Sequence, residues 1–312
     1  MELQEKFVQS VRMYFNLQGE EWLKKLPEII QYCEKKWSLQ IKEPYSLSIN
    51  YVAPAVMDDG SDVVVKICIP GKGFQDELDV LRLFDGEGMV KLIEFDEENG
   101  IFILERLTPG GTLAEVNDDE EACRIAANVV KRISVVAPRN CKIPTIKGRE
   151  DNLRGILEKH PNGIGPFSKH ILIKALNIFT YLNNTSTQQY LLHGDFHHYN
   201  VLSSGNSQWT AIDPKGLVGE VEYDLIQYML NKLPENNAFD VIKKRVEIFT
   251  EELQLNEQRL LLWGYCHTVL STSWSVDDKG NYETSFFQGV AIFEKLYEEK
   301  FGYIDALETR SE

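Results

Sequence analysis

Residues 191–225 read LLHGDFHHYNVLSSGNSQWTAIDPKGLVGEVEYDL, and the rest of the chain is organised around this stretch. Apolar Leu191 and Leu192 lead into a tight glycine turn that is followed by Asp195. A carboxylate at such a place can orient an incoming hydroxyl and accept its proton. Asn200 follows five residues later, and an amide oxygen suits a hard cation such as Mg²⁺ without adding charge.

A second carboxylate follows at the end of a predicted hairpin. Residues 201–202 and 209–212 read as two short apolar strands around the turn 203–207, and the second strand ends at Asp213. The separation between Asn200 and Asp213 is the one expected if the hairpin returns the chain to a metal site. The acid-to-amide spacing and the later carboxylate are those of kinase active sites, so the pattern indicates phosphoryl transfer from a nucleotide.

HGDFHHYNVL followed by AIDPKGLVGEVEYDL resembles the aminoglycoside phosphotransferase family, in particular its streptomycin 6-kinase and hydroxyurea kinase branch. The resemblance implies ATP and Mg²⁺ as cofactors and transfer of the γ-phosphate to an aminoglycoside hydroxyl, with the streptomycin 6-hydroxyl expected, which gives antibiotic resistance. Asp195 would be the catalytic residue, and Asn200 and Asp213 would hold the metal. Phe196 and Tyr199 depart from residues common in the family, which leaves the exact substrate open.

Two structural explanations compete with this interpretation. His193, His197 and His198 are three histidines in one loop, but a structural zinc site needs a fourth ligand at a suitable spacing and no cysteine lies nearby. Asp195 and Asn200 are also residue types that cap turns. We expect His193 to brace the loop, and the pattern assigns no role to His197 or His198.

Composition narrows the class of protein. The 48 acidic and 33 basic residues among 312 give a formal charge of −15, which argues against nucleic acid or an anionic membrane as main partner and suits a cationic small molecule. Acidity could equally serve solubility alone. Five scattered cysteines without C-x-x-C spacing favour reduced thiols. With neither a signal-peptide core nor a membrane span, we expect a cytoplasmic protein.

The first hundred residues predict an N-terminal lobe. Residues 2–38 have apolar positions at helical spacing and predict two helices separated by Gly19, and residues 45–69 read as β-strands. Lys66 lies in the apolar run VVVKI, where a buried cation needs a counter-ion. Glu77 matches the family's helix glutamate that pairs with the strand lysine, which implies that the pair positions the nucleotide phosphates. Neighbouring acidic residues at 76 and 79 could substitute for Glu77.

Further nucleotide contacts are implied by the resemblance. Ser48 and Asn50 stand where the family places a nucleotide-positioning loop, although an ordinary strand edge would explain the same residues. Glu105 and Leu107 fall in the connector whose backbone groups would hydrogen-bond adenine. A Pro-Gly-Gly run follows and marks the hinge.

The remaining predictions concern the acceptor. Trp274, followed by Asp277 and Asp278, offers an aromatic face and carboxylates to a guanidinium- or ammonium-bearing sugar, although a core tryptophan and a turn would give the same letters. Glu220 is predicted to lie near the cleft as a further candidate for substrate contact, although its role is undecided, as is that of Lys215. Asp224 is expected to brace the active-site loop rather than to act in catalysis.

We therefore predict a protein-kinase-like bilobal α+β fold. Residues 1–104 form the sheet-and-helix lobe with a helical extension, 105–111 the hinge, and 112–312 the larger helical lobe. Another small-molecule kinase, for hydroxyurea, an amino alcohol or a metabolite, and a nucleotide-binding module without turnover remain alternatives. The sequence leaves open the acceptor, the choice of ATP or GTP, and the oligomeric state. Helices of the second lobe are predicted at about 150–159, 167–184, 238–253, 259–274 and 283–300.

Overall fold

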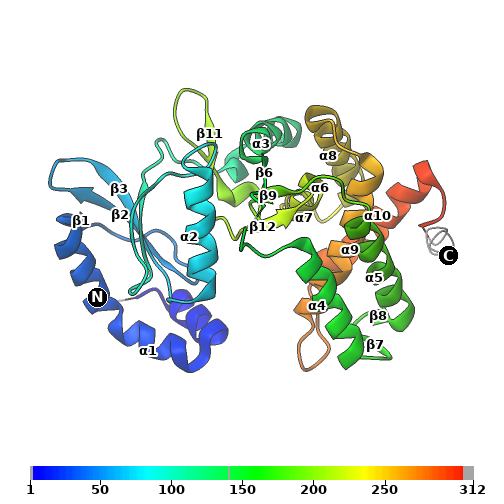
Figure 1. Ribbon diagram of the computed structural model, residues 1–312, viewed down its shortest axis with the longest axis horizontal. Coiled ribbons are helices and arrows are strands. Elements are labelled where there is room, and N and C mark those ends of the chain that lie inside the picture. The colour runs from blue at the N-terminus through cyan, green and yellow to red at the C-terminus, as the bar shows by residue number, and fades with distance from the viewer. Residues whose placement is uncertain (1–2, 140, 305–312) are drawn as a thin grey trace. The chain divides into compact units, whose positions relative to one another are not determined.

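The computed structural model describes residues 3–139 and 141–304, and its contacts divide the chain into two units (Figure 1). Unit 1 contains Met1–Gly111 and Leu202–Lys215, and unit 2 contains Thr112–Val201 and Gly216–Glu312. The sequence-based division placed all of 112–312 in the second lobe. The hairpin differs because its strand exchanges backbone hydrogen bonds with the first unit: Val90 N–H donates to the Ala211 carbonyl, and Ala211 N–H to the Gly88 carbonyl.

Unit 1 is built on a five-stranded antiparallel sheet in the order β1-β2-β3-β5-β4. The central strand β3 has the sequence DVVVKI, in which β-branched side chains favour the extended backbone. Its register places Lys66 beside Phe102 of β5. The elements of this unit are α1 (Glu5–Trp37), β1 (Leu39–Ile41), β2 (Tyr51–Met57), β3 (Asp62–Ile67), α2 (Lys72–Phe84), β4 (Leu92–Asp96), β5 (Ile101–Glu105) and β11 (Trp209–Ala211), which pairs with β10 (Val201–Ser203).

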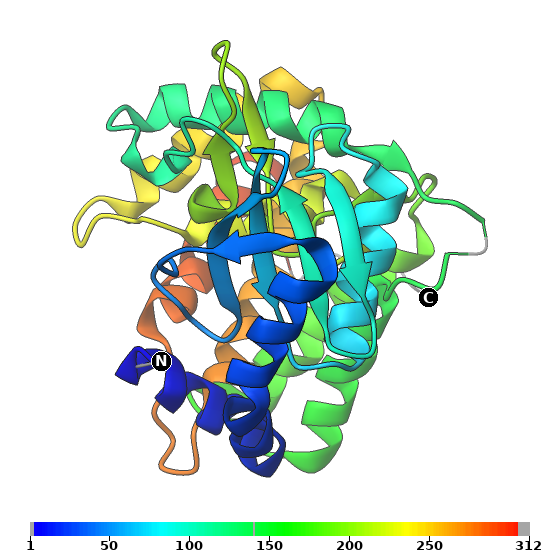
Figure 2. The same ribbon diagram turned by 90° about the vertical axis from the view of Figure 1, so that its left-hand side faces the viewer.

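Helices cover the two faces of this sheet, as Figures 1 and 2 show for α1 and α2. Val63, Val65 and Ile67 of β3 are buried in one cluster with α1 residues. Successive side chains of a strand alternate between faces, so Lys66 belongs to the opposite face. There Phe74 of α2 stacks on Phe102 with ring centroids 4.2 Å apart. The sheet therefore presents Lys66 toward α2.

The helical extension breaks at a different residue from the predicted one. Asn16 has a non-helical backbone (φ 50°, ψ −127°) inside α1, whereas Gly19 is helical. Gly19 serves packing, because a Cβ added there would lie 2.7 Å from the Val11 carbonyl oxygen. Glycine in this segment therefore marks a close contact between the two parts of the helix.

Unit 2 is mainly helical. α9 is buried on most of its circumference and packs against α5 and α10. None of the helices in the described part of the chain is long and apolar enough to cross a membrane. The elements of unit 2 are η1 (Leu113–Glu115), α3 (Asp119–Ile133), β6 (Val135–Val136), α4 (Ile146–Lys159), β7 (Gly163–Ile164), β8 (Phe167–Ser168), α5 (Lys169–Asn184), β9 (Tyr190–Leu192), η2 (His198–Asn200), β12 (Leu217–Gly219), α6 (Val221–Asp224), α7 (Ile226–Leu230), α8 (Ala238–Leu253), α9 (Glu257–Ser275) and α10 (Thr284–Phe301).

A small sheet in the order β12-β9-β6 carries the loop that the sequence singled out. Leu192 of β9 pairs with Leu217 of β12, and both side chains are buried. The chain leaves β9 at His193, so the start of the loop is held by strand pairing.

Candidate active site

Lys66 forms a buried ion pair with Glu77. The lysine side chain projects from β3 and the glutamate from α2, and each residue is only 4% exposed. The Lys66 Nζ lies 2.5 Å from Glu77 Oε1 and 2.7 Å from Oε2. A buried ammonium is costly unless it is paired and hydrogen-bonded, and this geometry supplies both conditions.

Asp213 completes this charge cluster in unit 1. One of its carboxylate oxygens contacts Lys66, and the other lies 3.0 Å from the Nζ of Lys215. The backbone of Asp213 has φ 57°, a left-handed conformation that is uncommon for residues other than glycine. Such backbone conformations are concentrated at functional sites.

The cluster fixes the protonation of its members. Burial alone would lower the pKa of Lys66, but the neighbouring Asp213 and Glu77 raise it above its ordinary value. Burial alone would raise the pKa of Asp213, but Lys66 and Lys215 lower it well below its usual range. Lys66 therefore stays a cation and Asp213 a carboxylate across the physiological pH range. Burial raises the pKa of Glu77 in spite of Lys66.

Asp195 lies in unit 2, in a loop whose backbone is hydrogen-bonded to the side chain of Asp224. Asp224 is buried at the end of α6, and its two carboxylate oxygens each accept a backbone N–H at 2.8 Å, from His193 and from Gly194. His193 is fully buried, and its Nδ1 accepts the backbone N–H of Asp195 at 3.2 Å. These bonds fix the backbone on both sides of the turn that presents Asp195.

The turn itself requires glycine. Gly194 has φ 81°, and a Cβ added there would lie 3.1 Å from the backbone nitrogen of Gly216. The Gly216 N–H donates to the His193 carbonyl at 2.9 Å, which joins the loop to the start of β12. The middle residue of the H-G-D element is therefore glycine because the turn is left-handed and lies close to another backbone segment.

Asn200 is oriented by the same loop. It is 7% exposed, and its Nδ2 donates to the Asp195 carbonyl oxygen at 3.0 Å. Because a carbonyl can only accept, this contact fixes which end of the amide faces Asp195 and directs the amide oxygen elsewhere. His197 lies beside both residues, with its Nε2 3.3 Å from Asn200 Nδ2 and 3.8 Å from Asp195 Oδ1.

Comparison with known proteins decides the family. The family of aminoglycoside/hydroxyurea antibiotic resistance kinases matches residues 38–279. The chain belongs to this family. A streptomycin 6-kinase of Streptomyces glaucescens is 27% identical over 288 residues, which cover 89% of this chain and 92% of that protein. A hydroxyurea phosphotransferase of Kitasatospora aureofaciens is 26% identical, over 89% of this chain and 81% of that one.

Solved structures agree on the fold. The choline kinase LicA from Streptococcus pneumoniae aligns with a TM-score of 0.62 at 17% identity, over 88% of this chain and 99% of that chain. The predicted protein-kinase-like α+β fold is thereby confirmed. The protein is accordingly an enzyme of the kinase class, and its family acts in antibiotic resistance.

The predicted nucleotide contacts of this antibiotic resistance kinase all lie in unit 1. Ser48 is exposed and Asn50 half-buried in the loop between β1 and β2. Glu105 ends β5, where its carboxylate accepts the Lys91 N–H at 2.7 Å and its own N–H donates to the Lys91 carbonyl at 3.0 Å. Leu107 is half-buried just after that strand. The binding role of these residues stays a prediction.

Glu220 takes part in an ion pair within unit 2, and its predicted contact with substrate stays a prediction. Glu220 is 8% exposed, and its carboxylate accepts the Arg259 Nε and Nη2 and the Trp263 Nε1, all at 2.8 Å. Both of its oxygens are therefore engaged in holding α9 against the start of α6. This ion pair is internal to unit 2, and no part of the local sequence pattern indicated it.

Trp274 is 44% exposed, but its ring and its indole N–H already contact other residues of the protein. The Arg149 guanidinium lies 5.1 Å from the centre of the Trp274 ring, and the indole N–H donates to Asn152 Oδ1 at 2.5 Å. A cation of the protein itself thus occupies an aromatic face that the sequence offered to a cationic sugar. Nothing in the local sequence pointed to Arg149, because its position comes from α4, more than a hundred residues earlier.

The two aspartates that follow differ from each other. Asp277 closes a turn, with its carboxylate accepting the N–H groups of Lys279 and Asn281 and the Asn281 side-chain amide at 2.8–2.9 Å. These hydrogen bonds from Asn281 lower the pKa of Asp277. Asp278 is exposed. The hydrogen bonds that close this turn are accepted by the carboxylate of Asp277.

His198 is a buried aromatic residue in the loop that carries Asp195 and Asn200. It is 1% exposed and stacks on Tyr228 with ring centroids 3.9 Å apart. Burial, with a contribution from Arg245, lowers the pKa of His198 to about 3, so the ring is neutral. The sequence assigned this residue no role, and the structure gives it a packing role between Asp195 and Asn200.

Proposed function

We propose that the protein transfers the γ-phosphoryl group of ATP to a hydroxyl of an aminoglycoside, with the 6-hydroxyl of streptomycin as acceptor. The streptomycin 6-kinase relative, matched over most of both chains, supports this substrate class. The observation that carries the reaction type is the buried Lys66 ammonium, which pairs with Glu77 and Asp213. An ammonium held in this way is suited to the phosphates of a nucleotide.

Each residue has one task in the proposed reaction. Asp195 accepts a hydrogen bond from the acceptor hydroxyl, orients its oxygen toward the γ-phosphorus, and takes up its proton as the P–O bond forms. Lys66 binds phosphate oxygens of ATP and stabilises the charge that develops on the departing ADP. Asp224 keeps the Asp195 loop in place through its two backbone hydrogen bonds and does not contact substrate.

Asn200 and Asp213 have the chemistry that a magnesium ion requires. Asp213 is an ionised carboxylate, and the Asn200 amide is anchored through its nitrogen, which leaves its oxygen available. Oxygen ligands of this kind are those preferred by Mg²⁺. When bound, the ion supplies charge neutralisation at the phosphate oxygens. Ser48, Asn50 and the backbone of Glu105 and Leu107 would position the nucleotide.

A hydroxyurea kinase is the second candidate, because one relative is a hydroxyurea phosphotransferase. The contact of Arg149 with Trp274 also favours it, since that aromatic face is already covered by a cation. An amino alcohol or another metabolite as acceptor, or a nucleotide-binding module without turnover, complete the alternatives. ADP release measured with streptomycin, hydroxyurea and a diverse acceptor panel, with and without magnesium, separates these functions.

Replacing Asp195 by Ala is the sharpest test of the mechanism. We expect turnover to fall by about 10²–10⁴-fold because the orienting base is lost, while ATP affinity stays within about threefold of the wild-type value. Asp240→Ala, which removes an exposed carboxylate on α8 of the same unit, is the matched control. Near-normal turnover of Asp195→Ala would contradict the assigned role. If the wild-type protein releases no ADP with any acceptor of the panel, the nucleotide-binding module without turnover is favoured.

A further inference from the structure

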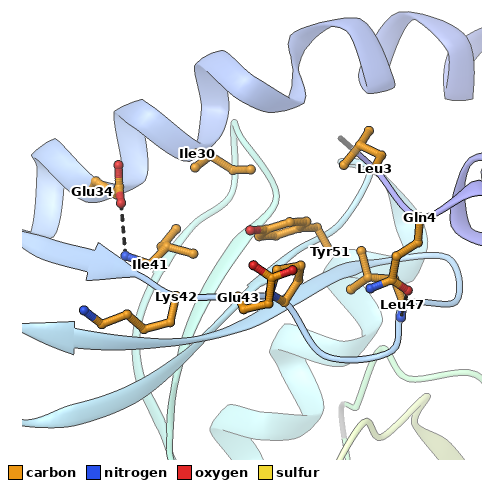
Figure 3. Close-up of a pocket in the computed structure, with 10 residues that line it drawn as sticks. Leu3, Gln4, Ile30, Glu34, Ile41, Lys42, Glu43, Leu47 and Tyr51 are labelled. Atoms are coloured by element: carbon orange, nitrogen blue, oxygen red, sulfur yellow. Dashed lines mark hydrogen bonds between the residues drawn. The ribbon is translucent and has the colours of Figure 1, made fainter. Parts of the chain in front are cut away.

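A cavity outside the candidate active site lies in unit 1, between α1 and the segment that joins β1 to β2 (Figure 3). Its volume of about 530 Å³ is that of a pocket for a small organic ligand. Ile30 of α1, Ile41 of β1 and Leu47 of the following loop supply apolar walls. Such walls favour a ligand with a hydrocarbon body.

The hydroxyl of Tyr51 is a polar group of the cavity wall. Tyr51 is 2% exposed, and Figure 3 shows its ring among the lining side chains, with the hydroxyl facing the side formed by Ile41 and Glu34. Within residues 3–139 and 141–304, no side-chain hydrogen bond involves this hydroxyl, and its oxygen keeps access to solvent through the cavity. A ligand that hydrogen-bonds to this hydroxyl would take the place of water there, so the contact would orient the ligand and add a modest amount of binding free energy.

Two carboxylates give the cavity its charge. Glu34 and Glu43 both line it, and their charges act on Tyr51, whose pKa is raised by burial first and then by these two residues. Glu34 uses one oxygen, Oε1, to accept the Ile41 N–H at 3.0 Å. Lys42 also lines the cavity, but its amino group contacts Gln40 and points away from Tyr51 in Figure 3. The wall that surrounds the Tyr51 hydroxyl is therefore anionic.

We propose that this cavity binds a small molecule that combines a protonated amine with an apolar body. The amine would lie between Glu34 and Glu43 and donate to the Tyr51 hydroxyl, and the body would contact the aliphatic wall. Ammonium groups pair well with carboxylates where apolar surroundings limit the competition from water. This site is separate from Lys66, whose side chain lies on the opposite face of the sheet.

The cavity is also connected to the predicted nucleotide loop, and this part of the inference rests on the proposed function. Gln4 bridges the start of the chain to the loop: its Nε2 donates to the Tyr45 carbonyl at 2.7 Å, and its Oε1 accepts the Leu47 N–H at 2.9 Å. Ser48 and Asn50 follow directly in the same loop. A ligand that contacts Leu47 and Glu43 would restrict this loop and change nucleotide affinity.

Calorimetric titration of the full chain with 2-phenylethylamine, and with the neutral 2-phenylethanol as a matched probe, tests the site without any turnover. We expect the amine to bind at least about tenfold more tightly than the alcohol. Glu43→Gln should lower the affinity for the amine by about tenfold, and Tyr51→Phe should lower it by several-fold. Glu94→Gln, an exposed carboxylate on β4 that does not line the cavity, should leave the affinity unchanged.

Ile30→Trp fills the cavity from the helix side and should abolish amine binding, with an unchanged far-ultraviolet circular dichroism spectrum as evidence of folding. Retained binding in Ile30→Trp would place the amine elsewhere, for example at the acceptor site, and would overturn the proposal. Equal binding of amine and alcohol, or no binding at millimolar concentration, would also overturn it. Nucleotide affinity measured with and without the amine tests the coupling, and an unchanged affinity with the cavity occupied would refute that part alone.

Discussion

At the scale of single residues, the decisive feature is a buried ammonium that is paired with two carboxylates. Lys66 can lie in the interior of unit 1 because Glu77 and Asp213 compensate its charge and its hydrogen-bonding capacity. The two carboxylates have different environments, since Glu77 is buried on α2 while Asp213 also contacts Lys215. Removal of Glu77 would therefore leave Lys66 with Asp213 as its anionic partner, and would draw the ammonium toward it.

We expect Glu77→Gln to lower the free energy of unfolding by about 1–3 kcal/mol, because a buried charge pair is lost. The KM for ATP should rise by about tenfold or more as the ammonium shifts from its place. Asp76→Asn, one residue earlier on α2, removes only a pair with the exposed Lys72 and should cost less than about 0.5 kcal/mol. Urea unfolding and initial-rate kinetics measure both variants, and equal effects of the two would contradict the importance of the buried pair.

Residue-level predictions from the sequence succeeded where a local rule applies. The buried position of Lys66 in an apolar strand required a counter-ion, and the structure supplies Glu77 eleven residues later in the chain. The same reasoning could not anticipate the use of Glu220, because its partner Arg259 comes from another helix, 39 residues away. The partner of Trp274 was equally hidden. Side chains whose surroundings come from distant segments have no signature in local spacing.

At the scale of secondary-structure elements, the packing of α9 against α10 depends on one small residue. A Cβ added at Gly264 would lie 2.4 Å from the Phe293 ring, and that ring is fully buried. The two helices approach each other through this contact. Gly155 of α4 is a useful contrast, because an added Cβ there meets nothing within 4 Å.

Gly264→Ala should therefore destabilise the protein by about 1–3 kcal/mol, since the aromatic ring must leave its position. Gly155→Ala should stabilise it by about 0.4–1 kcal/mol, because alanine restricts the unfolded chain and fits the helix. Thermal unfolding of the two variants gives opposite shifts of the midpoint. A stabilised Gly264→Ala would show that α9 and α10 do not pack as described.

A second contact between elements joins α1 to the sheet. Asp96, at the end of β4, accepts hydrogen bonds from Tyr32 at 2.8 Å and Lys36 at 2.6 Å, both from α1, and from the Asn99 backbone at 3.0 Å. Burial alone would raise the pKa of Asp96, but the hydrogen bonds from Lys36, Asn99 and Tyr32 lower it to about 2. The ionised form of Asp96 is therefore the one that stabilises this contact.

Because the pKa of Asp96 is lower in the folded than in the unfolded chain, its contribution is fully present above the ordinary value of 3.8. The contribution is lost as the pH falls from about 4 toward about 2. Asp96→Asn should consequently have a lower unfolding midpoint than wild type at neutral pH, and the difference should narrow below pH 4. A difference that stays constant across this range would mean that the carboxylate charge does not contribute.

The order of elements was largely predictable, since helices and strands follow local periodicity. The predicted helix at 238–253 coincides with α8 (Ala238–Leu253). The two strands of the hairpin that precedes Asp213 are present as β10 and β11. The break in α1 was misplaced from Asn16 to Gly19, because glycine signals both flexibility and close packing. Only the contact with Val11 shows which of these applies.

At the scale of the whole molecule, the contacts divide the candidate residues in a way that spacing could not reveal. Lys66, Glu77 and Asp213 belong to unit 1, whereas Asp195 and Asn200 belong to unit 2. The chain changes unit after Val201 and again after Lys215, so the hairpin that carries Asp213 is an insertion of the later sequence into the first unit. The convergence of Asp195, Asn200 and Asp213 around one ion stays a prediction.

The formal charge of −15 is a property of the whole chain, and it leads to a prediction that separates substrate attraction from mere solubility. A field of this sign attracts a cationic acceptor over distances comparable to the Debye length, which is about 10 Å at 0.1 M salt. The same field acts little on a neutral acceptor. The negative field of the chain repels the ATP anion at long range.

We therefore expect the KM for streptomycin to rise by roughly three- to tenfold when potassium chloride is increased from about 20 to about 300 mM. The KM for ATP should fall or stay constant over the same range, because screening weakens a repulsion. Hydroxyurea, which is uncharged, serves as the acceptor control and should show no comparable change. If the KM of streptomycin is as insensitive to salt as that of hydroxyurea, then the acidity of the chain serves solubility alone, and recognition of the acceptor must depend on short-range contacts.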